Sequence, residues 1–206
     1  MSFYNIHTHK RSEGVVSILN TYPDQYDDED QGFLSCGFHP WNVNGKESFE
    51  RLEQIIQQPN VVAIGETGFD ALKGASMGMQ RDSFEKHIEL SERYEKPLII
   101  HCVKAWDWLL ASQKKYDPKQ AWIIHGFRGK PEQMQQMLDK GMMFSIGERF
   151  NEKTVQLIPN DRFFCETDDS LIDIKEIYRI ITQTRGVDLM NLIEDVAKNI
   201  KSVFRI

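Results

Sequence analysis

Eight short apolar runs alternate with longer segments of helical periodicity along this chain. The apolar runs are FYNIH (3–7), VVSIL (15–19), FLSCGF (33–38), VVAIG (61–65), PLIIHC (97–102), AWIIH (121–125), MMFSIG (142–147) and RFFCET (162–167). Several runs are apolar without alternation, which is typical of parallel strands covered on both faces. Helical patterns lie near residues 47–57, 79–95, 104–116, 131–140, 151–158, 173–185 and 188–204. This alternation predicts an α/β fold, a TIM-barrel-like (β/α) barrel.

The first quarter of the chain departs from a regular barrel. Only a handful of residues separate His9 from Val15, whereas a parallel crossover ordinarily needs about a dozen or more. The connection between Leu19 and Phe33 is acidic, contains Pro23 and is a poor helix former. We therefore expect an abridged first quarter, in which the second run is antiparallel, displaced or at an edge. An open, doubly wound sheet is the alternative architecture.

Length and charge narrow the function. No repeat, low-complexity tract or linker interrupts the 206 residues, so residues 1–206 are predicted to form one domain. The net charge is −6, and the densest charge run, DQYDDED at 24–30, is acidic. This balance disfavours an extensive non-specific hold on a nucleic-acid duplex. A small anionic substrate or a strand end stays compatible, because bound divalent ions offset negative charge locally.

The remaining composition predicts a cytoplasmic protein. The three cysteines are far apart and form no Cys-x-x-Cys pair, as expected for reduced thiols. The N-terminus MSFYNIHTHK has no signal-peptide pattern, and no apolar run is long enough to span a membrane. We expect no membrane association and no obligate protein partner.

Five of the six histidines stand at the ends of apolar runs, where a barrel builds its active site. They are His7, His9, His39, His101 and His125, and the acids at equivalent places are Glu66, Asp70 and Asp168. His7 and His9 are two residues apart, so in a strand both imidazoles project from one face. Imidazoles and carboxylates together suit borderline divalent ions such as Zn²⁺ or Mn²⁺. The sixth histidine, His87, lies in a helical pattern and is expected to be a surface or packing residue.

The ordered motifs HTH, GFHP, GETGFD, PLIIHC, IIHGFRG and ETD resemble the TatD-type metal-dependent deoxyribonucleases, a branch of the amidohydrolase-like barrels. The resemblance runs nearly end to end. It includes MQRDSFEKHIELSERYEKP before the fifth run and the tail IYRIITQTRGVDLMNLIEDVAKNIKSVF. Each motif is modest by itself, but six in the correct order are specific.

The resemblance implies two divalent ions, Zn²⁺, Mn²⁺ or Mg²⁺. The first would be held by His7, His9, Glu66 and Asp168. Glu66 would bridge to a second ion, which His101 and His125 would also hold. A bridging carboxylate suits phosphodiester cleavage, which uses two metals about 3.5–4 Å apart and a metal-activated water. Asp168 would orient that water and accept its proton, so Asp168 and Glu66 are the predicted catalytic residues.

Several neighbours of these residues have two interpretations each. His39 lies outside the implied metal set, and we interpret it as a contact to the substrate phosphate or leaving group, or as a structural residue. Asp70 is expected to hold a nearby loop or a ligand histidine. Trp41 and Phe127 either stack on a base or pack as rim aromatics.

Three positions depart from the family pattern. Asn5 replaces an acid before the first histidine, Val103 replaces an arginine after the fifth-run histidine, and Ser170 replaces a proline after ETD. We predict a metal-dependent hydrolase, a TatD-like deoxyribonuclease acting on DNA ends or a small phosphodiester. One alternative is an amidohydrolase-like enzyme for a small ester, amide or phosphoester. The other, suggested by the missing arginine and short loops, is a non-catalytic metal-binding interaction protein.

Overall fold

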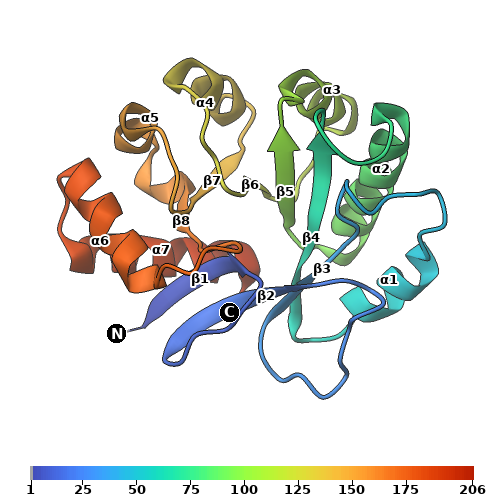
Figure 1. Ribbon diagram of the computed structural model, residues 1–206, viewed down its shortest axis with the longest axis horizontal. Coiled ribbons are helices and arrows are strands. Elements are labelled where there is room, and N and C mark those ends of the chain that lie inside the picture. The colour runs from blue at the N-terminus through green and yellow to red at the C-terminus, as the bar shows by residue number, and fades with distance from the viewer. Residues whose placement is uncertain (1) are drawn as a thin grey trace. The chain divides into compact units, whose positions relative to one another are not determined.

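The computed structural model describes residues 2–206, which form two compact units. Unit 1 combines the chain up to Leu19 with Ile124–Ile206, and unit 2 is Asn20–Ile123. The strands follow one another in chain order, from β1 to β8. Each predicted strand and each predicted helix is present within a few residues of its expected bounds (Figure 1). The prediction of a single domain over residues 1–206 stays a prediction.

Unit 1 is built around parallel strands and four α-helices, with a short 3-10 helix at Asn160–Arg162. Its elements are β1 (Phe3–Thr8), the first part of β2 (Val15–Thr21), the end of β6 (Trp122–Ile124), β7 (Met143–Ile146), β8 (Phe163–Cys165), α4 (Pro131–Leu138), α5 (Glu152–Leu157), α6 (Ile174–Arg185) and α7 (Leu189–Phe204). Helices α6 and α7 lie beside β1 and β8 (Figure 1). Two side chains tie them there: Tyr178 donates a hydrogen bond to the Tyr4 carbonyl (3.0 Å), and Asn199 donates one to the Phe163 carbonyl (2.9 Å).

Unit 2 has the longest strand of the protein at its centre. Its elements are β3 (Leu34–Cys36), β4 (Val61–Asp70), β5 (Leu98–Val103), α1 (Phe49–Ile56), α2 (Met77–Tyr94) and α3 (Trp106–Tyr116). Strand β4 pairs in parallel with β3 and β5, and each of its residues is buried. Burial on both faces explains why its sequence is apolar without alternation. Because β4 continues to Asp70, both predicted acids of this region lie within the strand.

The first quarter is abridged, but its second strand is not antiparallel as expected. Strand β2 pairs in parallel with β1, with Phe3 opposite Val15 and Thr8 opposite Leu19, and it follows β1 directly in the strand order. The prediction of an antiparallel, displaced or edge strand is therefore wrong. Residues 9–14 connect the two strands through bends and a turn, with Gly14 at φ +71°, and contain no helix.

Within residues 2–206, none of the helices combines the length and the apolar character that crossing a membrane demands.

Candidate metal centre

The end of β1 and the segment after β8 are joined by backbone hydrogen bonds. The Asp168 amide donates to the His7 carbonyl (3.0 Å), and the His9 amide donates to the Asp168 carbonyl (3.1 Å). Thr8, the last residue of β1, thereby forms a parallel bridge with Asp168, which lies beyond the end of β8. His7 and His9 flank Thr8, so this pairing brings both histidines of HTH close to Asp168 of ETD, which itself has a left-handed backbone (φ +55°).

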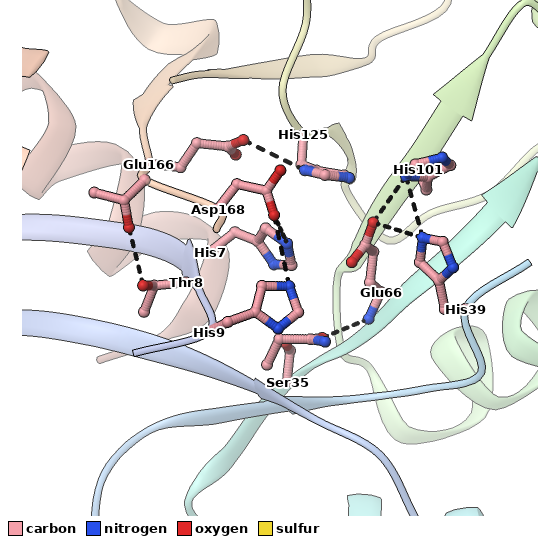
Figure 2. Close-up of polar contacts among 12 residues, drawn as sticks. His7, Thr8, His9, Ser35, His39, Glu66, His101, His125, Glu166 and Asp168 are labelled. Atoms are coloured by element: carbon pink, nitrogen blue, oxygen red, sulfur yellow. Dashed lines mark hydrogen bonds and ion pairs between the residues drawn. The ribbon is translucent and has the colours of Figure 1, made fainter. Parts of the chain in front are cut away.

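In unit 1 the side chains of His7 and His9 both point to the carboxylate of Asp168. The Nε2 atoms of His7 and His9 each lie 3.5 Å from Oδ1 of Asp168 (Figure 2). His7 is fully buried, whereas about a third of the His9 side chain is exposed. Burial alone would raise the pKa of Asp168, but the contacts with His7 and His9 outweigh it and hold the pKa well below its ordinary value. Asp168 is therefore ionised throughout the neutral range.

His125, directly after β6, belongs to the same cluster. Its ring centroid lies 4.4 Å from that of His7. On its other side, its Nδ1 lies 3.3 Å from Oε1 of Glu166, a carboxylate with no exposed surface (Figure 2). His7, His125 and Asp168 each offer one ligand atom, and these atoms lie within 4.8 Å of one another.

Unit 2 holds a second group of the same chemistry. Oε1 of Glu66 lies 2.8 Å from Nδ1 of His101 and 3.1 Å from Nε2 of His39 (Figure 2). The three residues are buried, and each offers one ligand atom within 4.8 Å of the others. His39, which the resemblance leaves outside the metal set, therefore lies directly against the predicted ligands Glu66 and His101. The Trp41 amide donates to Nδ1 of His39 (3.1 Å). Because Nδ1 is the acceptor, the ring N–H of His39 is on Nε2, which faces Glu66.

The backbone of β4 is shaped for this group. The Glu66 amide donates to Oδ1 of Asn20 (2.8 Å), which also accepts a hydrogen bond from the Ser35 hydroxyl (3.2 Å). Gly68 has φ +135°, and a Cβ there would lie 2.2 Å from the His101 carbonyl oxygen. Only glycine permits this approach of β4 to β5. It brings Glu66 on one strand within reach of His101 on the other.

Asp70 serves both of the roles expected for it. Its Oδ2 accepts the indole N–H of Trp41 (2.6 Å) and lies 3.3 Å from Nε2 of His101. Its Oδ1 accepts the amides of Leu72 (2.8 Å) and Lys73 (3.1 Å), which start the loop after β4. Burial would raise the pKa of Asp70, but these hydrogen bonds outweigh it and lower that pKa. The carboxylate orients the His101 ring and anchors the loop.

Each unit therefore contains a donor set that fits a divalent ion. Two imidazoles and a carboxylate, with ligand atoms within 4.8 Å, match the ligands that Zn²⁺ and Mn²⁺ take in proteins. The carboxylate partners of the ring nitrogens, Glu166 for His125 and Asp70 for His101, are the usual supports of ligand histidines. The number of ions, and a bridge through Glu66, stay predictions.

The comparisons with known proteins decide the family. The model of the TatD-related DNases matches residues 4–205. The chain belongs to this family. Among its curated relatives, the metal-dependent hydrolase YcfH of Escherichia coli strain K12 is 25% identical, over 93% of this chain and 83% of YcfH. The 3'-5' ssDNA/RNA exonuclease TatD of Erwinia tasmaniensis is 26% identical, over 76% of this chain and 63% of the relative.

A solved structure shows the fold. YjjV, a TatD homologue from Escherichia coli K12, superposes with a TM-score of 0.86 and 18% identity, over 99% of this chain and 98% of YjjV. The predicted class, a TatD-type metal-dependent hydrolase with a (β/α) barrel fold, is confirmed.

The departures of this TatD-family chain now have structural settings. Asn5 exchanges two hydrogen bonds with Thr167: its Nδ2 donates to the hydroxyl (2.8 Å), and its Oδ1 accepts the amide (3.1 Å). Ser170 donates to Oε2 of Glu148 (2.6 Å). Val103 is the last residue of β5, and its carbonyl accepts the Ala71 amide (2.9 Å). Asn5 thus holds β1 against the segment that carries Asp168.

The two aromatic residues with open interpretations, Phe127 and Trp41, differ in burial. Phe127 is buried, with its ring 4.7 Å from that of Phe144, so it packs. Trp41 leaves 43% of its surface exposed.

His87 is a packing residue and not a surface one: it is fully buried, and its Nε2 accepts a hydrogen bond from the Phe38 amide (3.0 Å).

Sequence reasoning missed Glu166 and Thr167. Both belong to the ETD motif, from which only Asp168 was chosen as a site residue. Glu166 and Asp168 are two apart after a strand, the same spacing as His7 and His9, and by regular alternation this spacing predicts that the two acids share a face. That signal was present in the sequence. The partnership of Thr167 with Asn5 spans 162 positions and left no local signal.

Proposed function

We propose that the protein is a metal-dependent phosphodiesterase that removes nucleotides from the ends of single-stranded nucleic acid, as a TatD-like deoxyribonuclease. The observation that carries this proposal is that each unit contains a histidine–carboxylate group, and that within each group the ligand atoms lie within 4.8 Å of one another. The relative in Erwinia tasmaniensis is named a 3'-5' ssDNA/RNA exonuclease, which supports this class of substrate.

The ligands proposed for two divalent ions are those predicted from the sequence, and divalent ions there would polarise a phosphodiester and lower the pKa of water. The residues themselves do the rest. Asp168, ionised and partly exposed, accepts a hydrogen bond from the attacking water and orients it. His39 presents an N–H on Nε2, which would donate to a phosphate oxygen of the substrate once Glu66 is engaged elsewhere.

The charge of the chain favours a strand end over a long duplex. The net charge is −6, so the protein lacks the basic balance that a broad hold on phosphates needs. A single terminal nucleotide brings few phosphates to the site. We propose Zn²⁺, Mn²⁺ or Mg²⁺ as the cofactor, and the cytoplasm as the location.

The test measures nucleotide release from single-stranded DNA with each of these ions, for the wild type and Glu66→Ala. The matched control is Glu89→Ala, which removes an exposed acid of α2 in the same unit. We expect release with the wild type and Glu89→Ala, and loss of about 100-fold or more with Glu66→Ala, together with less bound metal. Equal rates in all three proteins, or no release with any ion, would contradict the proposal.

A substrate screen separates the alternatives from this proposal. Wild-type protein is offered a carboxylic ester, an amide, a lactone and a phosphodiester under the same conditions. Hydrolysis of the carboxylic ester or amide, without DNA cleavage, would favour the amidohydrolase-like alternative. Stoichiometric metal without turnover of any of them would favour the interaction protein.

A further inference from the structure

Trp41 is an exposed aromatic residue fixed beside the candidate ligands of unit 2. Its ring centroid lies 4.7 Å from that of His39 and 5.8 Å from that of His101. The hydrogen bond from its indole N–H to Oδ2 of Asp70 (2.6 Å) fixes the orientation of the ring, although 43% of the residue is exposed. An oriented, exposed aromatic ring next to a catalytic group is suited to stacking.

A cation accompanies this ring. The ammonium of Lys73 lies 3.4 Å from the centroid of the Trp41 ring, on the exposed loop after β4. A cation–π contact at an exposed site is weak, so the ammonium can leave the ring for a stronger partner such as a phosphate.

The loop that carries Lys73 is built into the unit. Gln80 of α2 is almost completely buried, and its side chain holds both ends of the loop: Oε1 accepts the Asp70 amide (2.7 Å), and Nε2 donates to the Ala75 carbonyl (2.8 Å). Gly74 packs so closely on the Trp41 segment that a Cβ would lie 2.5 Å from the Pro40 carbonyl oxygen. These buried contacts therefore fix the backbone of the loop on which Lys73 lies beside Trp41.

We infer that Trp41 and Lys73 form a nucleotide-binding subsite beside the unit 2 ligands. The terminal base stacks on the indole, and the ammonium of Lys73 moves from the ring to the phosphate of that nucleotide. Base stacking on an aromatic ring tolerates any base, and a lysine reads the phosphate as a charge, so the subsite selects a nucleotide without selecting its sequence. Lys73 thereby supplies a positive charge in the unit where Val103 stands in place of the arginine of the family pattern. This inference rests on the proposed function and names the substrate unit that this part of the site recognises.

The kinetic test compares two single-stranded oligonucleotides under conditions of metal-dependent cleavage. One has an ordinary terminal nucleotide, and the other has an abasic unit at that end. Trp41→Ala is expected to lower kcat/KM for the ordinary oligonucleotide by about 10-fold, with a much smaller loss for the abasic one. Trp41→Phe is expected to recover most of the difference, because phenylalanine still stacks although it cannot donate to Asp70.

Lys73→Met is expected to lower kcat/KM for both oligonucleotides by the same factor, because each carries the phosphate. It should also make the slope of log kcat/KM against log salt shallower by about 0.7, the value for one phosphate contact on a single strand. Trp108→Ala is the matched control, because Trp108 is also partly exposed (38%) and lies on α3 of the same unit. That variant should retain the wild-type selectivity between the two oligonucleotides.

The outcomes separate this inference from the proposed function. If the wild type cleaves both oligonucleotides and Trp41→Ala affects them equally, the inference is wrong while the nuclease proposal stands. The same conclusion follows if Trp41→Phe behaves like Trp41→Ala, because Trp41 would then act only through Asp70. If the wild type cleaves neither, the proposed function fails, and binding decides the inference alone.

The binding test uses calorimetry on the 206-residue protein with Mn²⁺. Deoxyadenosine 5′-monophosphate should bind more tightly than 2-deoxyribose 5-phosphate, and Trp41→Ala should abolish that preference. Equal binding of the two compounds to the wild type would overturn the inference.

Discussion

The Nδ1 atom of His125 lies 3.3 Å from Oε1 of Glu166, whose side chain has no surface exposed to water. A buried carboxylate beside one ring nitrogen favours the N–H on that nitrogen and leaves Nε2 with its lone pair, which is the form that binds a metal. Glu166 therefore sets the orientation and the tautomer of His125, a predicted metal ligand, without being a predicted ligand itself.

Replacing Glu166 by glutamine should weaken metal binding in the unit 1 group. We expect a loss of about 10- to 100-fold in affinity for Zn²⁺, because the amide keeps the volume but no longer favours the required tautomer. Titration with a competing chelator measures the affinity. Glu194→Gln, at an exposed position of α7, is the control and should bind as the wild type does. Unaltered affinity in Glu166→Gln would show that the carboxylate has only a packing role.

Removal of the Asn5 side chain should weaken the attachment of β1 to the segment carrying Asp168. Asn5→Ala deletes both hydrogen bonds to Thr167 in a buried setting, so we expect a loss of about 2–3 kcal/mol in the free energy of unfolding. Asn5→Asp should lose less, because aspartate still accepts the Thr167 amide. Urea unfolding measures both values. Equal stability of Asn5→Ala and the wild type would contradict the role assigned to this contact.

A methyl group at Gly68 should disrupt the contact between β4 and β5. Gly68→Ala would force a Cβ to 2.2 Å from the His101 carbonyl at φ +135°, and we expect a loss of about 2–4 kcal/mol in stability from strain and overlap together. Because the shift falls on His101, metal binding should weaken too. Gly78→Ala is the control, since a Cβ there meets no atom within 4 Å. Thermal unfolding and metal titration of both variants provide the check.

His87 should make stability depend on pH in the acidic range. Burial lowers the pKa of this histidine from 6.5 to about 4, so the folded protein keeps it neutral where the unfolded chain takes up a proton. The stability that depends on a neutral His87 is fully present above pH 6.5. As the pH falls from 6.5 towards 4, the free energy of unfolding decreases by about 3 kcal/mol in total, because the unfolded chain binds the proton first.

The comparison of His87→Gln with the wild type isolates this contribution. The variant should be less stable at pH 7, because the Phe38 amide and the Ser83 carbonyl each contact the imidazole. Its free energy of unfolding should nevertheless fall less steeply between pH 6.5 and pH 4. Parallel curves for the two proteins, measured by urea unfolding at each pH, would exclude His87 as the source.

The sequence by itself determined the elements and the places of the candidate ligands. Runs such as VVAIG and FFC are strands, and segments such as 188–204 are helices, because burial imposes a local periodicity that the chain displays directly. Histidines and acids at or near the ends of apolar runs marked HTH, GETGFD and ETD as the places of the candidate ligands. Glu66, however, lies inside β4, whereas the run VVAIG places it after the strand.

Only the tertiary structure decided which of these residues meet. The parallel direction of β2, the burial of Glu166 behind His125, the exchange between Asn5 and Thr167, and the ammonium of Lys73 over Trp41 have no local signature. Each depends on the spacing of backbones that are distant in sequence, down to the glycine that lets β4 approach β5. Hydrogen bonds and ion pairs act over about 3 Å, and distances of that size exist only after the strands have paired.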